Sequence, residues 1–300
     1  MRTARRSSLH FARASSLAVI LALCAAPGLS TAFAAAQTQP SRAPSTATIV
    51  VCAPGYPGGT EQAQPAMDAF AAAAASAAGW NAGALRAVYD ETEDKGLSRL
   101  SEKDAAFALV TLPFFLAHGD ALKCAPRLQA VQASGPDETW SLVAKKGAIG
   151  KASDLDGWEV TGRAGFFPPF VKGTVLGDWG VLPQSVRITF ASRALPALRR
   201  AAAGEKVAVV LEGEEASALA SLPFAKDLEV VAQSKPAPGN ILCSLEGRLD
   251  PARGDDLVEA LLVLQKSADG AEALKGLRMV RFAKVDMQSL AAARDRLSHP

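Results

Sequence analysis

The strongest constraint on the fold is an alternation of short apolar or β-branched runs with Ala- and Leu-rich stretches along the chain. This alternation is typical of βα units built around a mainly parallel sheet, so the sequence predicts an α/β fold. We expect Asp90 to begin one of the helices, with Glu93 in the capping-box position. In the first half the expected order is strand 47–52, helix 61–78, strand 84–89, helix 93–100, strand 105–111, strand 126–132 and strand 139–144.

The same alternation restarts after residue 150. The final part completes neither block as a domain, so we expect the chain to cross from a first domain to a second and to return. The crossing strands are expected near 139–144 and 237–245. This assigns 47–140 and 241–300 to a first, discontinuous lobe and 141–240 to a second. The expected order here is a helical turn at 153–157, strand 158–161, helix 167–176, strand 185–190, helix 193–202, strand 207–211, helix 214–222, strand 228–232, strand 241–245, helix 254–266, strand 279–285 and helix 287–297.

The N-terminal segment has the three zones of a secretory signal. Four arginines precede an apolar run at 17–26, and small residues follow it. A membrane span needs about 20 apolar residues, so this run is too short. We therefore expect 1–36 to be a signal peptide, 37–46 to be a flexible leader, and the protein to be periplasmic. Cys24 leaves a lipoprotein signal open as an alternative, although the bulky Leu23 before it is unlike such signals.

The charge balance argues against nucleic acid as a partner. The whole chain has 32 Lys and Arg against 30 Asp and Glu, a formal charge of +2. Four of the basic residues lie in the predicted signal, so the mature chain keeps 28 basic residues against 30 acidic ones, a charge of −2. Nucleic-acid-binding proteins present a basic face, and this balance does not predict one.

Three cysteines remain after removal of the signal: Cys52, Cys124 and Cys243. An odd number in an oxidising compartment leaves at least one thiol free or paired between chains, so the chain is no disulfide scaffold. Which thiols pair stays open. Cys52 lies inside an apolar run, so we expect it to behave as a small buried hydrophobe and not as a nucleophile.

The first strand runs into a loop rich in Gly and Pro at 53–60. A P-loop needs Gly-Lys-Ser/Thr at its end, and here Thr60 follows Gly59 with no lysine. Ligands of open α/β sheets bind beyond the carboxyl ends of the strands, where this loop lies. We expect Gly58 and Gly59 to let backbone N–H groups approach a ligand ahead of a helix that Thr60 begins, and Tyr56 to add an aromatic face with one hydroxyl. A plain βα turn with a surface tyrosine is the alternative.

Three more residues stand at strand ends or on a crossing strand. Thr111 would offer its hydroxyl to a cleft, or cap the next helix. Trp140 would wall a pocket, or pack the hinge. Glu212 would bind a ligand amine or hydroxyl, or remain an exposed carboxylate of no function. Each is a candidate ligand contact with its structural alternative.

The sequence offers no catalytic set. Of the three histidines, His10 falls in the signal and His299 in the tail, which leaves His118 alone. A metal cluster would lack a second histidine, and a Ser/His/Asp triad would lack a nucleophile elbow. We expect His118 to lie at a helix C-terminus, next to Gly119. The chain is therefore expected to be no enzyme and to hold no cofactor and no metal.

Several segments resemble the type-2 periplasmic solute-binding proteins, and within them the substrate-binding components of phosphate, phosphite and phosphonate ABC transporters. The resemblance implies an α/β fold of two lobes, in which two βα domains are joined by two crossing strands with a ligand cleft between them. Besides the secretory leader, the segments that carry the resemblance are 53–60, 104–115, 138–146 and 270–282.

One segment departs from that family. Its phosphonate binders tend to present a Ser/Thr-rich turn at the start of a helix in the second lobe, where hydroxyls and amides hold the anion. This chain has Arg-Ala-Gly-Phe-Phe-Pro-Pro at 163–169, which puts phosphonate as the ligand in doubt. Gly165, Phe166 and Phe167 are instead candidate ligand contacts, because two adjacent aromatic residues cannot both face one core.

Residues and resemblance together predict an extracytoplasmic solute-binding protein, expected to be a monomer. It would close by hinge motion around a small ligand, with an anion as one option, and deliver it to the membrane permease of an ABC-type transporter. One alternative is a sensor or scaffold of the same fold whose cleft is filled by Phe166, Phe167 and Trp140. A periplasmic hydrolase that uses Glu212 and His118 is a third option.

Overall fold

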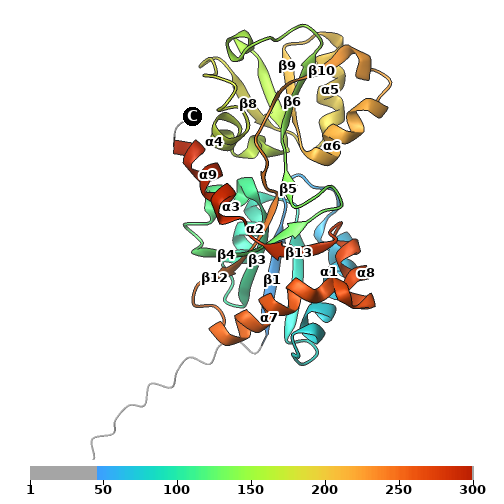
Figure 1. The fold of residues 1–300 in the computed structure, drawn as a ribbon, viewed down its shortest axis with the longest axis vertical. Helices are drawn as coiled ribbons and strands as arrows, with labels where there is room; N and C mark the ends of the chain where they lie inside the picture. The colour runs from blue at the N-terminus through green and yellow to red at the C-terminus, as the bar shows by residue number, and fades with distance from the viewer. Residues whose placement is uncertain (1–45, 299–300) are drawn as a thin grey trace, which may run out of the picture. The chain divides into compact units, whose positions relative to one another are not determined.

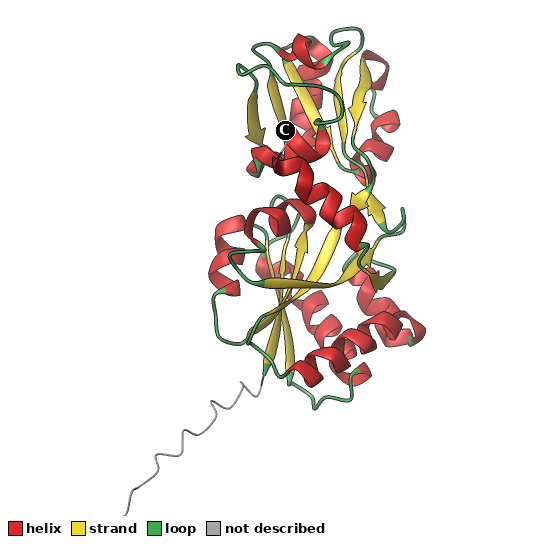
Figure 2. Cartoon of the chain, turned by 60° about the vertical axis from the view of Figure 1, so that its left-hand side comes forward, coloured by secondary structure: helices red, strands yellow, loops and turns green. Residues whose placement is uncertain are grey.

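The computed structural model describes residues 46–298. The predicted signal peptide, and the predicted leader except for its last residue, lie outside the described residues. Within 46–298 no helix combines the length and the apolar character that a bilayer span requires. The described strands form a six-stranded, a five-stranded and a two-stranded sheet, and helices pack against the two larger sheets (Figure 2). We call the six-stranded sheet with its helices lobe 1, and the five-stranded sheet with its helices lobe 2.

Lobe 1 combines strands from the beginning and the end of the described chain. Its strands are β1 (Ala47–Cys52), β2 (Leu85–Asp90), β3 (Ala105–Thr111), β4 (Cys124–Val131), β12 (Asn240–Leu245) and β13 (Arg281–Lys284). The sheet order is β13-β4-β12-β3-β1-β2, so blue β1 and orange β12 share one sheet in Figure 1. β1 is parallel to β2 and β3, whereas β12 lies antiparallel between β3 and β4. The helices are α1 (Thr60–Ala77), α2 (Glu93–Leu100), α3 (Leu112–His118), α7 (Pro251–Val263) and α8 (Ala268–Gly276).

Lobe 2 is built from the middle of the chain. Its strands are β6 (Ser141–Lys145), β7 (Glu159–Gly162), β8 (Arg187–Phe190), β9 (Val207–Leu211) and β10 (Leu228–Gln233), in the order β10-β6-β9-β7-β8. β7 is parallel to β8 and β9, and β6 is antiparallel to β9. The helical segments include η1 (Ala152–Leu155), η2 (Arg163–Phe166), α4 (Pro168–Phe170), the π-helix η3 (Val171–Val175), α5 (Ala194–Ala203) and α6 (Gly213–Ala218).

Two short strands join the lobes. β5 (Asp137–Glu138) lies between β4 and β6, and β11 (Ala237–Pro238) lies between β10 and β12. They pair antiparallel, with Ala237 opposite Glu138 and Pro238 opposite Asp137. The strand expected at 139–144 begins only at Ser141, as β6, and Trp140 lies between β5 and β6 outside either strand. The crossing segment expected at 237–245 is divided into β11 and β12. This paired crossing gives the chain a narrow hinge where it leaves lobe 1 and returns.

Several expected helix starts differ in the structure. Gly59, and not Thr60, is the N-cap of α1, and α7 begins at Pro251 and not at 254. α2 begins after Thr92, whose Oγ1 accepts a hydrogen bond from the Lys95 amide at 3.4 Å. Asp90 is not its cap, because β2 stays in parallel register with β1 through the pair Cys52–Asp90. The helix expected at 167–176 is divided into α4 and η3. Phe167 precedes a proline and has φ −121° and ψ 82°, outside the helical region, as expected for a residue before proline.

The last helix, α9 (Met287–Ser298), follows β13 of lobe 1 but packs against η3 of lobe 2 (red in Figure 1). Thr174 Oγ1 of η3 donates a hydrogen bond to the carbonyl oxygen of Ala293 at 3.1 Å. A Cβ atom on Gly173 would lie 2.2 Å from the carbonyl oxygen of Arg296, so only glycine permits this approach. α9 is thus a further connection between the lobes, beside the two hinge strands.

Candidate functional site

The loop between β1 and α1 faces lobe 2. Gly55 has a φ of +80°, in the left-handed region that favours glycine. A Cβ atom at this position would lie 2.9 Å from the Phe190 ring and 3.1 Å from Cγ of Arg163, and both of those residues belong to lobe 2. The Tyr89 hydroxyl holds the loop from below by donating to the carbonyl oxygen of Tyr56 at 3.2 Å. The glycine-rich loop therefore lets side chains of lobe 2 lie directly on its backbone.

A polar network joins the two lobes at Tyr56. Its hydroxyl donates a hydrogen bond to Oε2 of Glu212, 2.6 Å away at the end of β9. Nη2 of Arg163 donates to the same oxygen at 3.0 Å and lies 3.2 Å from Oε1 of Glu215. The guanidinium of Arg163 also stacks on the Tyr56 ring, 4.4 Å from its centroid. Tyr56 of lobe 1 is thus bound to Glu212 and Arg163 of lobe 2, and Arg163 links this pair to Glu215.

Burial shapes the ionisation of this network. Desolvation raises the pKa of Tyr56 well above its usual value, and the charge of Glu212 raises it further. Desolvation also raises the pKa of Glu215, against the opposing effect of Arg163. Burial by itself would lower the pKa of Arg163, but the two carboxylates and Tyr56 leave it raised. Tyr56 is therefore a neutral hydrogen-bond donor, and Arg163 is a fixed cation.

A second carboxylate ties the hinge to lobe 2. Oε1 of Glu138, on β5, accepts hydrogen bonds from the amides of Gly213 at 2.6 Å and Thr139 at 3.1 Å. A Cβ atom on Gly213 would lie 2.7 Å from that oxygen, so a larger residue would make the Glu138 side chain shift. Desolvation raises the pKa of Glu138, although the amide of Gly213 opposes this shift. The start of α6 is in this way bound to the crossing strand.

Two hollows flank the network, and Tyr56, Pro57 and Gly58 line both of them. The larger, of about 680 Å³, lies between the lobes. Its walls are Pro54, Gly55, Glu91, Thr92 and Glu93 of lobe 1 and Phe166, Phe190, Ser192 and Arg193 of lobe 2. The smaller, of about 370 Å³, is lined mainly by lobe 1, including Gln62, Gln132, Asn240 and Arg278, with Glu214 from lobe 2. Both volumes are in the range of small-molecule sites.

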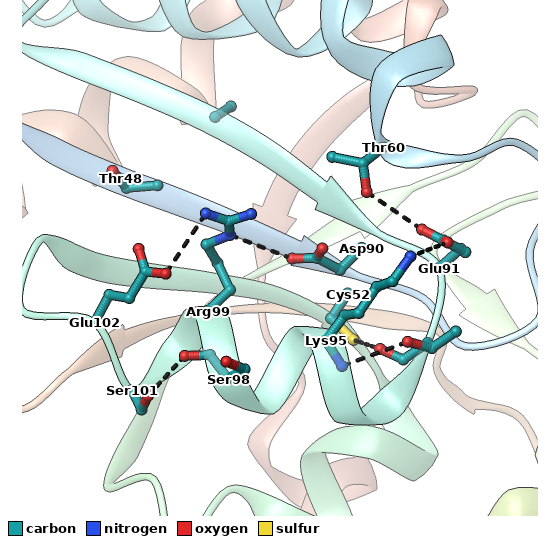
Figure 3. Close-up of polar contacts among 12 residues, drawn as sticks. Thr48, Cys52, Thr60, Asp90, Glu91, Lys95, Ser98, Arg99, Ser101 and Glu102 are labelled. Atoms are coloured by element: carbon teal, nitrogen blue, oxygen red, sulfur yellow. Dashed lines mark hydrogen bonds and ion pairs between the residues drawn. The ribbon is translucent and has the colours of Figure 1, made fainter.

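Glu91 lies in the loop between β2 and α2 and lines the larger hollow. Its side chain reaches Thr60, the first residue of α1 (Figure 3). Its carboxylate accepts a hydrogen bond from the hydroxyl of Thr60 at 3.3 Å and pairs with Nζ of Lys95 at 2.6 Å. The side chain of Thr60 therefore already has a carboxylate partner. Gly58, with φ +98°, lines both hollows, whereas Gly59 lines neither.

Thr111 and Trp140 are buried and are not exposed at the surface of a cleft. Thr111 is 5% exposed and Trp140 is 1% exposed, and neither lines a hollow. Oγ1 of Thr111 and Nε1 of Trp140 have no hydrogen-bond partner within the described residues. The Trp140 ring meets Phe170 edge-on, with 4.9 Å between ring centroids. These placements favour the packing alternatives, although ligand contact by either residue stays a prediction.

The turn after β7 carries three candidate ligand contacts, which differ in their surroundings. Gly165 packs so closely on β8 that a Cβ atom would lie 2.0 Å from the carbonyl oxygen of Thr189, which explains the glycine without a ligand. Both Phe166 and Phe167 pack against the core, and Phe166 also lines the larger hollow. Ligand contact by either ring stays a prediction. Glu212 is buried and paired, which differs from its exposed alternative.

Sequence reasoning missed Arg163, Phe190 and Glu138. Arg163 lies in segment 163–169, which lacks the Ser/Thr-rich turn of the family. No local pattern shows that it reaches Tyr56, 107 positions away in the chain. Phe190 ends a predicted strand, and its 47% exposure is a surface property that only the fold reveals. Strand ends that carry a large or charged side chain were the available signal.

Other reactive groups have structural partners. Nε2 of His118, in the last turn of α3, lies 2.6 Å from Oε1 of Glu93. Burial raises the pKa of the Cys52 thiol, which donates to the carbonyl oxygen of Thr92 at 3.5 Å. Cys124 and Cys243, on the paired strands β4 and β12, are free thiols like Cys52. In the part of the chain from 46 to 298, no group of three or more His, Cys, Asp or Glu could hold a metal ion.

Comparison with known proteins shows the fold. No protein-family model matches the sequence, and no curated protein matches it. Among solved structures, XAC2383 from Xanthomonas citri, bound to chloride, superposes with a TM-score of 0.67 at 13% identity over 84% of this chain and 98% of that one. A binding-protein component of an ABC phosphonate transporter from Pseudomonas aeruginosa gives 0.61 at 18% identity, over 84% and 86% of the two chains. PhnD1 from Prochlorococcus marinus, in complex with methylphosphonate, gives 0.56 at 13% identity, over 83% and 96%.

These likenesses confirm the predicted α/β fold of two lobes joined by two crossing strands, the type-2 periplasmic binding protein fold. At 13–18% identity they show the fold and not the ligand.

Proposed function

We propose that this chain is an extracytoplasmic solute-binding protein that captures a small molecule between its lobes and delivers it to the membrane permease of an ABC-type transporter. The observation that carries the proposal is the hollow of about 680 Å³ that both lobes line, in a chain whose lobes are joined by two paired strands. A ligand that contacts both walls stabilises the closed arrangement by its differential affinity for it. Two of the similar solved structures support a transport role: one is a binding-protein component of an ABC phosphonate transporter, and the other is in complex with methylphosphonate.

The contacts around the hollow fit capture and not turnover. Phe166 and Phe190 provide apolar walls, and Glu91, Thr92 and Ser192 provide polar atoms. Such a mixture of apolar surface with a few polar groups is the usual composition of a small-molecule site. The one histidine in the described range, His118, does not line the hollow, although its carboxylate partner Glu93 does. The periplasmic location and monomeric state that the sequence predicts belong to this proposal.

Membership in the phosphonate subgroup and an anionic ligand are more specific proposals. Two residues of lobe 2 bear on it, because Pro168 and Pro169 occupy the first positions of α4 and have no N–H group to offer an anion. The test is a thermal-shift and calorimetric screen of the full chain, exported through its own leader and purified without refolding. The panel is methylphosphonate, phosphate, phosphite, ATP, amino acids, amines and vitamins.

Saturable binding of one panel class, with compaction in small-angle X-ray scattering, is the expected result. No stabilisation by any class and no compaction would exclude capture and favour a second candidate, a sensor or scaffold that binds no solute. The cross-lobe contacts of Tyr56 with Arg163 and Glu212 favour that candidate, because they close the lobes without a ligand.

A further inference from the structure

Arg163 is a cation that already occupies a built binding position. Its guanidinium lies over the face of the Tyr56 ring, and its Nη2 atom contacts one carboxylate oxygen each of Glu212 and Glu215. An aromatic face with carboxylates at its edge is the arrangement by which proteins recognise guanidinium and quaternary ammonium groups. The side chain is 13% exposed, and it enters from lobe 2 to lie on a residue of lobe 1. The position is therefore a cation seat between the lobes, filled by the protein's own side chain.

The surroundings of the seat carry more negative than positive charge. Glu138 lies on the crossing strand, and Glu212, Glu214 and Glu215 lie at the start of α6. Glu212 is buried, Glu138 and Glu215 are partly buried, and Glu214 is exposed; Arg163 is paired with Glu212 and Glu215. Burial of several carboxylates near one guanidinium is unfavourable unless a further positive charge compensates them. A solute cation that takes the place of Arg163 would supply the same compensation.

Two groups that would otherwise bind an anion already have partners within the protein. The start of α1, the longest helix beside the larger hollow, already has the carboxylate of Glu91 on Thr60. A helix N-terminus favours a negative charge, and Glu91 supplies it from within the protein. Two glutamates pair with Nη2 of Arg163, which balances its charge, whereas its Nε has no hydrogen-bond partner within residues 46–298. Arg193, which lines the larger hollow, and Arg278, which lines the smaller one, have no ion pair within residues 46–298.

We propose that the solute presents a guanidinium or ammonium group, and that this group competes with Arg163 for the Tyr56 ring and the carboxylate of Glu212. The proposal rests on the solute-binding function proposed above and specifies the class of solute. Arg163 then acts as a tethered competitor that keeps the seat filled while the cleft is empty. Because a tethered group has an effective concentration on the order of mM, it weakens binding of the solute without abolishing it.

The proposal predicts opposite effects for two substitutions in the same network. Arg163→Ala removes the competitor and leaves the ring and both carboxylates in place, so a cationic probe should bind at least tenfold more tightly. Glu212→Gln removes the charge that holds the cation, so the same probe should bind at least tenfold more weakly. If Arg163 were instead an anion-binding residue, Arg163→Ala would abolish binding of the anion.

The experiment titrates the full chain by isothermal calorimetry with agmatine, which carries a guanidinium and an ammonium group, and with methylphosphonate as the anionic probe. Variants are Arg163→Ala, Arg163→Gln, which keeps a polar side chain if the alanine variant folds poorly, and Glu212→Gln. Arg200→Ala is the matched control, because Arg200 pairs with Glu159 and Glu205 on lobe 2, at residues that line neither hollow. Circular dichroism and thermal melting verify the fold of each variant.

Agmatine binding that strengthens in both Arg163 variants, weakens in Glu212→Gln and is unchanged in Arg200→Ala supports the proposal. Equal agmatine affinity in wild type and Arg163→Ala overturns it, and so does methylphosphonate binding that is lost in Arg163→Ala. In the latter case the solute-binding function still stands, with an anion as its ligand. Failure of both probes and of the whole panel with the wild-type chain overturns the solute-binding function itself, which distinguishes the two failures.

Discussion

The hydroxyl of Tyr56 donates a hydrogen bond to the carboxylate of Glu212 across 2.6 Å, and the two residues are 156 positions apart in the chain. Tyr56 follows the first strand of lobe 1, and Glu212 follows β9 of lobe 2. Both residues thus extend from the carboxyl ends of their strands, where ligands of open α/β sheets bind. The bond therefore spans the place where the fold would hold a solute.

Tyr56→Phe should loosen the lobes while keeping the aromatic face. A hydrogen bond to a charged acceptor is worth about 1.5–3 kcal/mol, so we expect a comparable loss in the free energy of unfolding. We also expect a larger radius of gyration for the unliganded variant in small-angle X-ray scattering. The control is Tyr89→Phe, which removes a hydroxyl that bonds within lobe 1 only. An increase in radius for Tyr89→Phe but none for Tyr56→Phe would contradict this role.

Much of the fold follows from local patterns. β1, β3 and β9 are apolar runs buried along their whole length or nearly so, and their bounds in the structure agree with the pattern to within a residue. The return of the chain was also predictable, because the segment after 240 begins with a strand and lacks a full βα set. Residues whose environment is set by their own strand or helix are the ones that sequence periodicity describes.

The site was less predictable because its partners come from distant segments. Glu212 and Tyr56 were named as candidates, but their mutual bond was not, since nothing local relates β9 to the first loop. The cap at Thr92 depended on how far β2 remains paired with β1, which is a tertiary property. Arg163 was not predicted for the same reason, because its partners, the Tyr56 ring and two carboxylates, come from distant segments.

Glu138 should make stability depend on pH. Burial raises its pKa in the folded state above the ordinary value of 4.5, so the folded chain binds this proton more tightly than the unfolded chain. The free energy of unfolding should therefore fall as pH rises from about 4.5 through the folded-state pKa, and then level off. Glu138→Gln should flatten that fall, as measured by urea unfolding between pH 4 and pH 8.

The neighbouring carboxylate on the same strand provides the control. Asp137 is exposed, so Asp137→Asn should leave the pH dependence as it is in the wild type. A fall that persists unchanged in Glu138→Gln would assign the effect to another group, of which Glu215 is the next candidate because burial raises its pKa also.

The thiols should react in a fixed order. Cys52 and Cys243 are both fully buried and burial raises their pKa values, so neither should react with a maleimide before the chain unfolds. Cys124 is only partly buried, and its contact with the Cys243 thiol lowers its pKa, so it should react first. Mass spectrometry of the labelled native chain measures the order, and Cys124→Ser should remove the early adduct. Early labelling of Cys52 would show that its strand opens in the native state.

The packing of α9 on lobe 2 should depend on Gly173, because this residue has no side chain. In Gly173→Ala the new methyl group would meet the backbone carbonyl of Arg296, which cannot rotate away as a flexible side chain would. Overpacking of this kind costs about 1–3 kcal/mol, so the melting temperature should fall. Protection of the amides of α9 against hydrogen exchange should fall with it. Gly150→Ala is the control in the same lobe, because a Cβ atom there meets only a carboxylate oxygen of Asp154 at 3.6 Å. Equal losses in the two variants would mean that the close packing of α9 on η3 contributes nothing specific to the connection between the lobes.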